Sequence, residues 1–251
     1  MKKIGKILAA LTAVTLCVGA LPAVQVALPR VSIAASAESA DGLTYQLINN
    51  STEVAITGCD DDVTIATIPS EIEGKPVTKI SSYAFSSKSK LVKVTIPDSV
   101  ISIENSAFNG CSHLRIVTMA NSVQTMGTAI FANCSELKEV TLSESLTEIK
   151  GSTFDSCNNL TEIVIPDSVT TIGNSAFSSC PRLKQISLSK NLVSIGNNAF
   201  QSCPALTSVE LPGSVTTMGN YVFCDCTGLE YVSMPKSLTS MGYSLFSSCS
   251  A

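Results

Sequence analysis

The chain has 251 residues, a net charge of −4 and a pI of about 5.1, and charged residues make up only 14% of it. Nucleic-acid-binding proteins normally carry a concentrated basic face and aromatic stacking platforms. Here no Lys/Arg cluster follows the first six residues, Trp is absent and aromatics reach only 5%, so nucleic acid is excluded as a partner. Intrinsic disorder is excluded too, because 45% hydrophobic residues can build a core.

Residues 1–37 have the pattern of a secretory signal peptide. Three lysines within the first six residues precede the apolar run ILAALTAVTLCVGALPAV, and the small residues Ala35-Ser36-Ala37 follow it. We predict cleavage after Ala37. The alternative is an uncleaved membrane anchor, because the apolar stretch is long enough to span a bilayer. No second such run follows, so we expect the mature chain to lie outside the cytoplasm without inserting into a membrane.

Residues 38–62 are predicted to form an N-terminal cap hairpin. The segment LTYQLINNSTEVAITG (Leu43–Gly58) alternates around Asn49-Asn50, which is typical of two strands joined by a tight turn. We expect this hairpin to cover the open end of the core that follows. The neighbouring Asp60-Asp61-Asp62 could ligate Ca²⁺, but three adjacent acids without spaced partners more often form a solvated loop.

The eight Phe residues divide residues 63–251 into units of constant length. The interval from each Phe to the next never changes; Cys follows three positions after all but the first, and Leu follows six positions after each of the first seven. The unit reads L-x-x-[IV]-x-[IL]-P-x-S-[VL]-x-x-[IM]-G-x-x-A-F-x-x-C-x-x. The repeated Phe residues are Phe85, Phe108, Phe131, Phe154, Phe177, Phe200, Phe223 and Phe246.

A period that does not drift indicates a solenoid, because each unit has apolar residues that only stacked neighbours can bury. The alternation up to Pro97 predicts a short strand, Val100–Ile103 predicts a second extended piece, and Asn-Ser-Ala-Phe-x-x-Cys predicts a helical turn or tight loop. Glycine after the second strand predicts a corner with positive φ; Glu104 and Lys150 depart from that pattern. The corner glycines are Gly127, Gly173, Gly196, Gly219 and Gly242.

The unit resembles the BspA-like leucine-rich repeat of bacterial surface proteins, over roughly Val63–Cys249. Its irregular first coil, with five extra residues between Pro69 and Val77 that should form a protruding loop, resembles the opening coil of such proteins. The resemblance implies a β-rich solenoid of the α/β leucine-rich repeat type: a right-handed stack of eight coils of about 23 residues, with a parallel sheet and short helical turns. It also implies a secreted or cell-surface location and no catalytic residues.

The Cys column could be a disulfide ladder or a metal stack, or a row of small buried hydrophobes beside the Phe residues. Side chains in an in-register stack point in parallel rather than at each other, and the odd number of Cys after the signal peptide fits no complete pairing. We therefore predict buried, free thiols. Cys224 stands off the column, and we predict that it faces outward as the most reactive thiol.

No catalytic or metal-binding motif occurs. His113 is the only histidine and has no metal-ligand spacing around it, which predicts an exposed turn residue. LPGSV (Leu211–Val215) superficially resembles a sorting signal but occupies a regular repeat position. We predict that the protein is not an enzyme, binds no metal and uses no cofactor.

A ligand surface is expected on the outward positions of the first strand of each coil, because these form a long preordered face. The alternative is that they are ordinary solvated strand residues, with Thr present for its β propensity. The candidate residues are Lys93, Thr95, Thr118, Glu139, Thr141, Glu162, Gln185, Ser187, Glu210, Tyr231 and Ser233. The predicted partner is an extracellular protein or glycan, bound by weak contacts multiplied over many copies.

The sequence ends at Ala251 without a polar final coil, so we expect a missing C-terminal cap, a fragment of a longer gene product, and self-association through the uncapped end. Two functions remain open. One is an adhesion or ligand-binding module. The other is a structural spacer in a longer extracellular protein that carries an enzymatic or wall-anchoring domain elsewhere.

Overall fold

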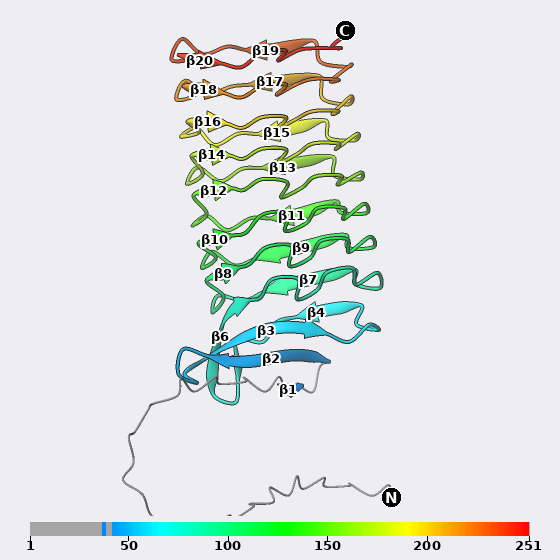
Figure 1. Cartoon of the computed structure of the whole chain (residues 1–251), viewed down its shortest axis with the longest axis vertical. Helices are drawn as coiled ribbons and strands as arrows, with labels where there is room; N and C mark the ends of the chain where they lie inside the picture. The colour runs from blue at the N-terminus through cyan, green and yellow to red at the C-terminus, as the bar shows by residue number, and fades with distance from the viewer. Residues whose placement is uncertain (1–36, 39–41, 251) are drawn as a thin grey trace, which may run out of the picture. The chain divides into compact units, whose positions relative to one another are not determined.

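The computed structural model describes residues 37–38 and 42–250, so the predicted signal peptide lies outside the described residues. The described residues form a β-solenoid of about eight coils (Figure 1). These residues contain no helix, and therefore none that is long and apolar enough to cross a membrane.

An antiparallel hairpin stands at the N-terminal end of the solenoid. Strands β2 (Leu43–Ile48) and β3 (Glu53–Cys59) form it, and β1 (Ala37–Glu38) pairs antiparallel with β2. The turn between β2 and β3 holds three consecutive left-handed residues, with φ of 50°, 56° and 65° at Asn49, Asn50 and Ser51. Strand β3 pairs in parallel with β6 (Lys75–Ile80), so the hairpin continues the sheet of the first coil.

The extra residues of the first coil form a second, smaller hairpin. Strand β4 (Ile65–Thr67) is followed by β5 (Glu71–Ile72), which pairs antiparallel with β6. Glu73 and Gly74 join them, both with positive φ (54° and 70°), as a tight two-residue turn requires. The Tyr45 hydroxyl donates a hydrogen bond to Glu73 Oε1 at 2.9 Å. The expected protruding loop is therefore an ordered hairpin bonded to the cap.

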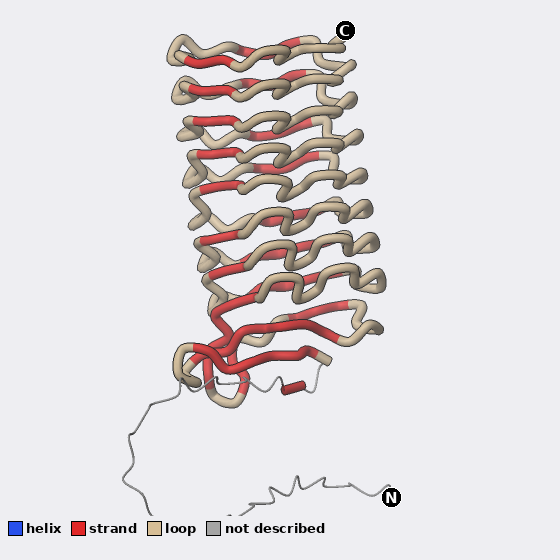
Figure 2. The backbone as a smooth tube through the Cα atoms, viewed as in Figure 1, coloured by secondary structure: helices blue, strands red, loops and turns tan. Residues whose placement is uncertain are grey.

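Each later coil adds one strand to each of two sides (Figure 2). We call the side of the first strands the strand face and the other the second side; parallel neighbours align equivalent positions of consecutive repeats, such as Lys93 and Ile116. The strand face contains β7 (Lys93–Ile96), β9 (Ile116–Met119), β11 (Glu139–Thr141), β13 (Glu162–Val164), β15 (Gln185–Ser187), β17 (Ser208–Glu210) and β19 (Tyr231–Ser233). The second side contains β8 (Ser102–Ile103), β10 (Thr125–Met126), β12 (Glu148–Ile149), β14 (Thr171–Ile172), β16 (Ser194–Ile195), β18 (Thr217–Met218) and β20 (Ser240–Met241).

The third side consists of turns, so the solenoid and its parallel sheets are confirmed but the predicted helical turns are wrong. The N–H groups of Ser106, Phe108 and Gly110 donate to carbonyls of the following coil at 2.8–3.0 Å. An α-helix would need these donors for its own i−4 carbonyls. Ser106 and Gly110 also have positive φ (56° and 73°), which interrupts any helical run.

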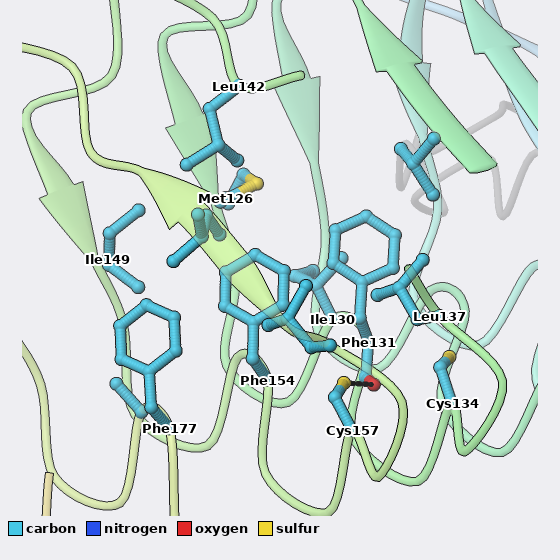
Figure 3. Packing of buried hydrophobic residues seen from close by; sticks show 14 of the residues in the cluster. Met126, Ile130, Phe131, Cys134, Leu137, Leu142, Ile149, Phe154, Cys157 and Phe177 are labelled. Atoms are coloured by element: carbon cyan, nitrogen blue, oxygen red, sulfur yellow. Dashed lines mark hydrogen bonds between the residues drawn. The ribbon is translucent and has the colours of Figure 1, made fainter. Parts of the chain in front are cut away.

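The Phe column forms the centre of the core. Consecutive rings stack with centroids 4.9–5.7 Å apart and interplanar angles of 6–18°. All except Phe246 in the last coil are completely buried, and Figure 3 shows part of the stack with the aliphatic side chains around it. Since stacked aromatic pairs add stability beyond their buried area, this column contributes to cohesion between the coils.

The Cys column is buried, apart from the half-buried Cys249, and carries no disulfide among the described residues, which confirms the prediction of free thiols. Each thiol of the column donates to the carbonyl of a Phe in the preceding coil; Figure 3 shows Cys157 Sγ and Phe131 O, 3.2 Å apart. The prediction that Cys224 faces outward is wrong. Cys224 is only 8% exposed, because Ser247 of the next coil lies against it.

The predicted reason for the corner glycines is also wrong. None of the five has a positive φ; the described glycines that do are Gly42, Gly74 and Gly110. A Cβ on Gly196 would instead lie 2.6 Å from the backbone nitrogen and from Oδ1 of Asn174 in the preceding coil. Glycine stands at these corners because the neighbouring coil leaves no space for a side chain.

Candidate functional site

The structure places all eleven predicted surface residues on strands of the strand face. Lys93, Thr95 and Ser233 are half-buried, and the other eight are exposed. Five of the exposed residues line one groove: Glu139, Thr141, Glu162, Gln185 and Ser187. The remaining six lie on the same face outside it.

The groove is an open depression of about 530 Å³ that crosses β11, β13 and β15. Its lining includes Lys138, Glu144 and Pro166, none of which the sequence analysis selected. Val164 is its most exposed apolar residue, with 68% of its surface accessible, at a position where the other coils carry Thr, Ser or, at Glu210, Glu. The groove thus combines an apolar patch, hydroxyl groups and carboxylates.

The groove lies at an interruption of the strand face. Strand β11 pairs with β9 and β13 pairs with β15, but β11 and β13 do not pair with each other. The second side is interrupted between β10 and β12, just before this point in the chain. There the backbone N–H groups of Thr147 and Lys150 reach no carbonyl of the described residues, whereas the equivalent N–H groups of Thr170 and Gly173 donate at 2.9 and 2.7 Å.

Asparagine side chains connect most consecutive coils by a hydrogen bond, which we call a tie and which lies at the corner after the second-side strand. Their Oδ1 atoms accept hydrogen bonds of 2.7–3.0 Å from backbone N–H groups of the following coil. The donor always follows a glycine, so the asparagine occupies the space that a Cβ would need. The pairs of tie and glycine are Asn105 with Gly127, Asn174 with Gly196, Asn197 with Gly219, and Asn220 with Gly242.

The interrupted corner is the one that lacks both the tie and the glycine: Thr128 replaces the asparagine and Lys150 replaces the glycine. One replacement alone is tolerated, since Gly151 stands at the asparagine position before Gly173 and the backbone bond there is intact.

Glu104, which also follows a coil without the asparagine, supplies a different tie. Its Oε2 accepts a hydrogen bond from the Ser82 N–H at 3.1 Å, and its own N–H still donates to Ile80 O at 2.9 Å. A lysine ammonium group cannot accept a hydrogen bond, so Lys150 provides no such replacement.

A second interruption lies between β15 and β17 on the strand face. A groove there shares Glu162 and Gln185 with the first and adds Thr161, Lys184, Ala205 and Thr207. The second side remains paired at this level, because β16 and β18 are bonded in register. The strand face is therefore least closed over coils β11 to β17.

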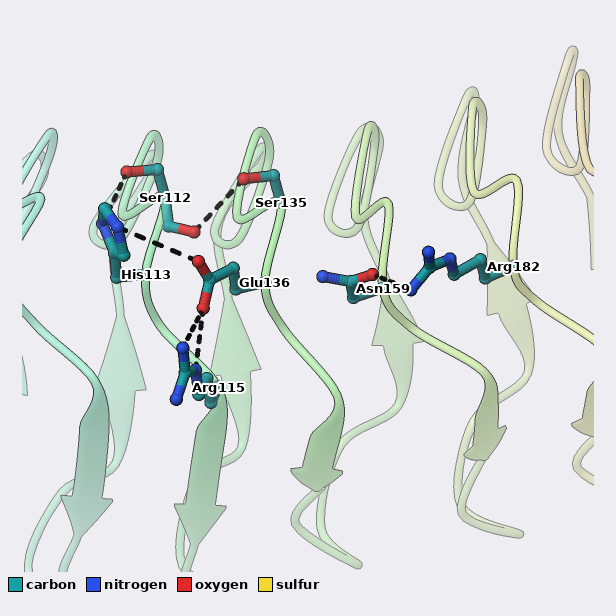
Figure 4. A network of polar contacts seen from close by, with 7 residues as sticks. All are labelled: Ser112, His113, Arg115, Ser135, Glu136, Asn159 and Arg182. Atoms are coloured by element: carbon teal, nitrogen blue, oxygen red, sulfur yellow. Dashed lines mark hydrogen bonds and ion pairs between the residues drawn. The ribbon is translucent and has the colours of Figure 1, made fainter.

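A charged cluster precedes the strands at the edge of this face (Figure 4). Arg115 Nη2 lies 2.6 Å from Glu136 Oε2, and this guanidinium lowers the pKa of the Glu136 carboxyl. His113 is exposed in the turn, as predicted, with Nδ1 3.2 Å from Ser112 Oγ and Nε2 3.8 Å from Glu136. In the next coils Arg182 donates to Asn159 Oδ1 at 2.6 Å. These groups satisfy one another, and no group of three metal-ligating side chains is found in the described part of the chain.

Comparison with protein-family models gives matches to the BspA type leucine rich repeat region over residues 62–171 and 148–251. The chain belongs to this family. The matched segments coincide with the repeated coils described above, and they confirm the resemblance that the Phe, Cys and Leu columns carry. A search of the curated proteins finds no match.

Solved structures similar to this BspA-type chain are bacterial leucine-rich repeat proteins. One from Bacteroides ovatus has 30% identity and a TM-score of 0.72, covering 80% of this chain and 54% of its own, so this chain spans about half its length. The Treponema pallidum leucine rich repeat protein has 28% identity and a TM-score of 0.64 (85% and 90% covered). A leucine rich cell surface protein of Faecalibacterium prausnitzii has 24% identity and a TM-score of 0.62 (84% and 73%), which shows the shared fold.

The structure places the predicted surface residues together on the strand face, but the sequence analysis did not single out the groove. Lys138, Glu144 and Pro166 were not selected because each looks like an ordinary repeat position, and Val164 was not selected although it is the apolar member of a polar column. The corner sequence marks the interruption of the second side instead: Lys150 is the one non-glycine corner residue without an asparagine or a side-chain acceptor to compensate.

Proposed function

We propose that this BspA-type solenoid is a non-catalytic binding module of a secreted or cell-surface protein, which takes up proteins or glycans on its strand face. The observation that carries the proposal is the groove over β11, β13 and β15, where five predicted surface residues converge. Its shallow, open form suits a segment of a larger molecule rather than an enclosed small substrate.

The chemistry of the face supports binding over catalysis. Active sites need several groups that converge on a reacting atom, with a nucleophile beside a base. The groove holds carboxylates, hydroxyls and an amide but no histidine and no cysteine. A long regular face suits weak contacts that add up when many copies act together.

A display experiment tests the proposal. The full chain, multimerised on beads, is incubated with a panel of matrix proteins and glycans. Two variants are compared: Thr141→Arg with Ser187→Arg on the strand face, and Thr147→Arg with Val193→Arg on the second side as a control of equal charge. We expect only the strand-face variant to lose binding. The proposal fails if no ligand binds even the multimerised chain, or if both variants bind as the native chain does.

A spacer role is the second candidate, favoured by the way the coils are joined. Each coil beyond the first bonds to its immediate neighbours, so the length of the solenoid grows with the number of repeats without changing its cross-section. A chain that binds nothing in the display experiment would favour this role.

A further inference from the structure

The arrangement of charges in the groove narrows the class of ligand; this inference deepens the proposed function and depends on it. Glu139 and Glu162 occupy equivalent positions of consecutive coils, and both line the groove at the interruption between β11 and β13. Like charges directly opposite on neighbouring strands repel. Neither carboxylate makes an ion pair or a side-chain hydrogen bond with any described residue.

Two nearby carboxylates outside the groove are paired. Glu136 binds Arg115 and Asp167 binds Lys190, each across consecutive coils. Lys138 and Glu144 also line the groove, so its charged groups comprise three carboxylates and one ammonium. The excess of negative charge at Glu139 and Glu162 therefore favours a positively charged ligand.

Val164 supplies the second element of recognition. It lies next but one to Glu162 on β13 and is the exposed apolar side chain of the groove. Thr141 and Ser187 flank it on the aligned positions of β11 and β15. An apolar surface beside two unpaired carboxylates matches a side chain with an aliphatic stem and a cationic head, which is the chemistry of Lys and Arg.

The size of the groove fits one such side chain from an extended segment. Neighbouring strands are about 4.8 Å apart, so three strands span roughly 10 Å. An extended chain advances about 3.3 Å per residue, so about three residues fit along the groove. We propose that the groove binds a Lys or Arg side chain of a partner protein, with its stem on Val164 and its head group between Glu139 and Glu162.

Fluorescence anisotropy with short labelled peptides tests this proposal. The probe is Gly-Ser-Gly-Lys-Gly-Ser-Gly or its Arg counterpart, titrated with the full chain at about 50 mM salt, where screening is weak. Peptides with norleucine or Glu at the central position are the comparisons. We expect the Lys and Arg peptides to bind more tightly than the norleucine peptide, and the Glu peptide to bind weakest.

Two charge-matched double variants locate the site. Glu139→Gln with Glu162→Gln should weaken Lys-peptide binding by about two- to thirtyfold, because two exposed ion pairs are lost. Glu71→Gln with Glu230→Gln removes the same charge from exposed positions outside the groove and should change binding less than twofold. Val164→Thr should reduce affinity for the norleucine and Lys peptides alike.

Each outcome decides the proposal. Equal effects of the two double variants would show that only net charge attracts the peptide, and the proposal would be wrong. Absence of Lys- and Arg-peptide binding up to millimolar concentration would also overturn it. A ligand from the display experiment whose binding needs the strand face but not Glu139 and Glu162 would leave the proposed function standing and remove this inference alone.

Discussion

Asn174 and Gly196 occupy complementary spaces on consecutive coils. The Asn174 Oδ1 accepts a hydrogen bond from the Asn197 N–H at 2.8 Å, and a Cβ on Gly196 would lie 2.6 Å from that oxygen. The same pairing recurs at three other corners, which makes the corner the site where coil spacing is set. This relationship leads to the first two predictions.

Gly196→Ala should destabilise the fold by about 1–3 kcal/mol, because the added methyl group overpacks a contact that includes backbone atoms. Gly213→Ala is the matched control, since no atom lies within 4 Å of its would-be Cβ and its φ is not positive. That control should be neutral or stabilising by about 0.4–1 kcal/mol. Urea unfolding measures both, and equal midpoints for the two variants would contradict the packing explanation.

The interrupted corner should show in amide hydrogen exchange. The N–H groups of Thr147 and Lys150 have no acceptor among the described residues, so they should exchange faster than those of Thr170 and Gly173, which are bonded to the preceding coil. Mass spectrometry or NMR on the native chain can compare the two coils. Equal protection of the two pairs of N–H groups from exchange would mean that Thr147 and Lys150 are also hydrogen-bonded to the preceding coil in solution.

Restoring the tie and the glycine should close this corner. Thr128→Asn combined with Lys150→Gly is expected to slow exchange at residues 147 and 150 and to raise stability by about 0.5–2 kcal/mol, the usual range for such repairs. Unchanged exchange at residues 147 and 150 in this variant would show that the missing tie and glycine do not cause the interruption of the second side.

Phe177→Ala should cost about 3–5 kcal/mol, as expected for truncation of a fully buried aromatic side chain. Phe246→Ala in the last coil should cost clearly less, because that ring is 42% exposed. Thermal or urea unfolding compares the two. A similar cost at both positions would indicate that ring stacking, rather than burial, dominates the column.

Stability should fall in alkaline solution because of the buried thiols. Burial raises the pKa of Cys180 to about 12 from an ordinary value of 9.0, and that of Cys59 to about 11. The folded state therefore holds these protons more tightly than the unfolded chain. The stabilisation is fully present below pH 9 and is lost as the pH rises toward 12.

Urea midpoints at pH 8 and pH 10.5 measure this loss, and Cys180→Ala should make the decline shallower. An unchanged slope in the variant would assign the pH dependence to other groups.

The repeat made the fold predictable from sequence, because each column states which positions are buried in every coil. Phe177, Leu183 and Ile172 are buried for the reason that their columns implied. What a single coil cannot show is where its N–H groups bond. The backbone N–H groups of Ser106 and Phe108 donate to carbonyls of the following coil. Because the sequence of one coil does not show these bonds, it was equally compatible with the predicted helical turn.

The corner depends on pairs of positions rather than on columns. Gly196 is explained by Asn174 in the preceding coil, and the gap at Lys150 by Thr128 at the same separation. A comparison of equivalent positions alone does not reveal such relationships between different positions of consecutive coils. The strand face follows from the columns, whereas the absence of pairing between β11 and β13 does not show in any one of them.

The strict bonding between immediate neighbours also has a consequence for the gene. Ile96–Cys111 and Ile165–Cys180 are nearly identical in sequence and lie three coils apart. Unequal exchange between the DNA segments that encode them would delete or duplicate three whole coils and leave every remaining ladder in register. Such a family can change the length of its strand face in one recombination event. No chain with an incomplete coil has to arise on the way.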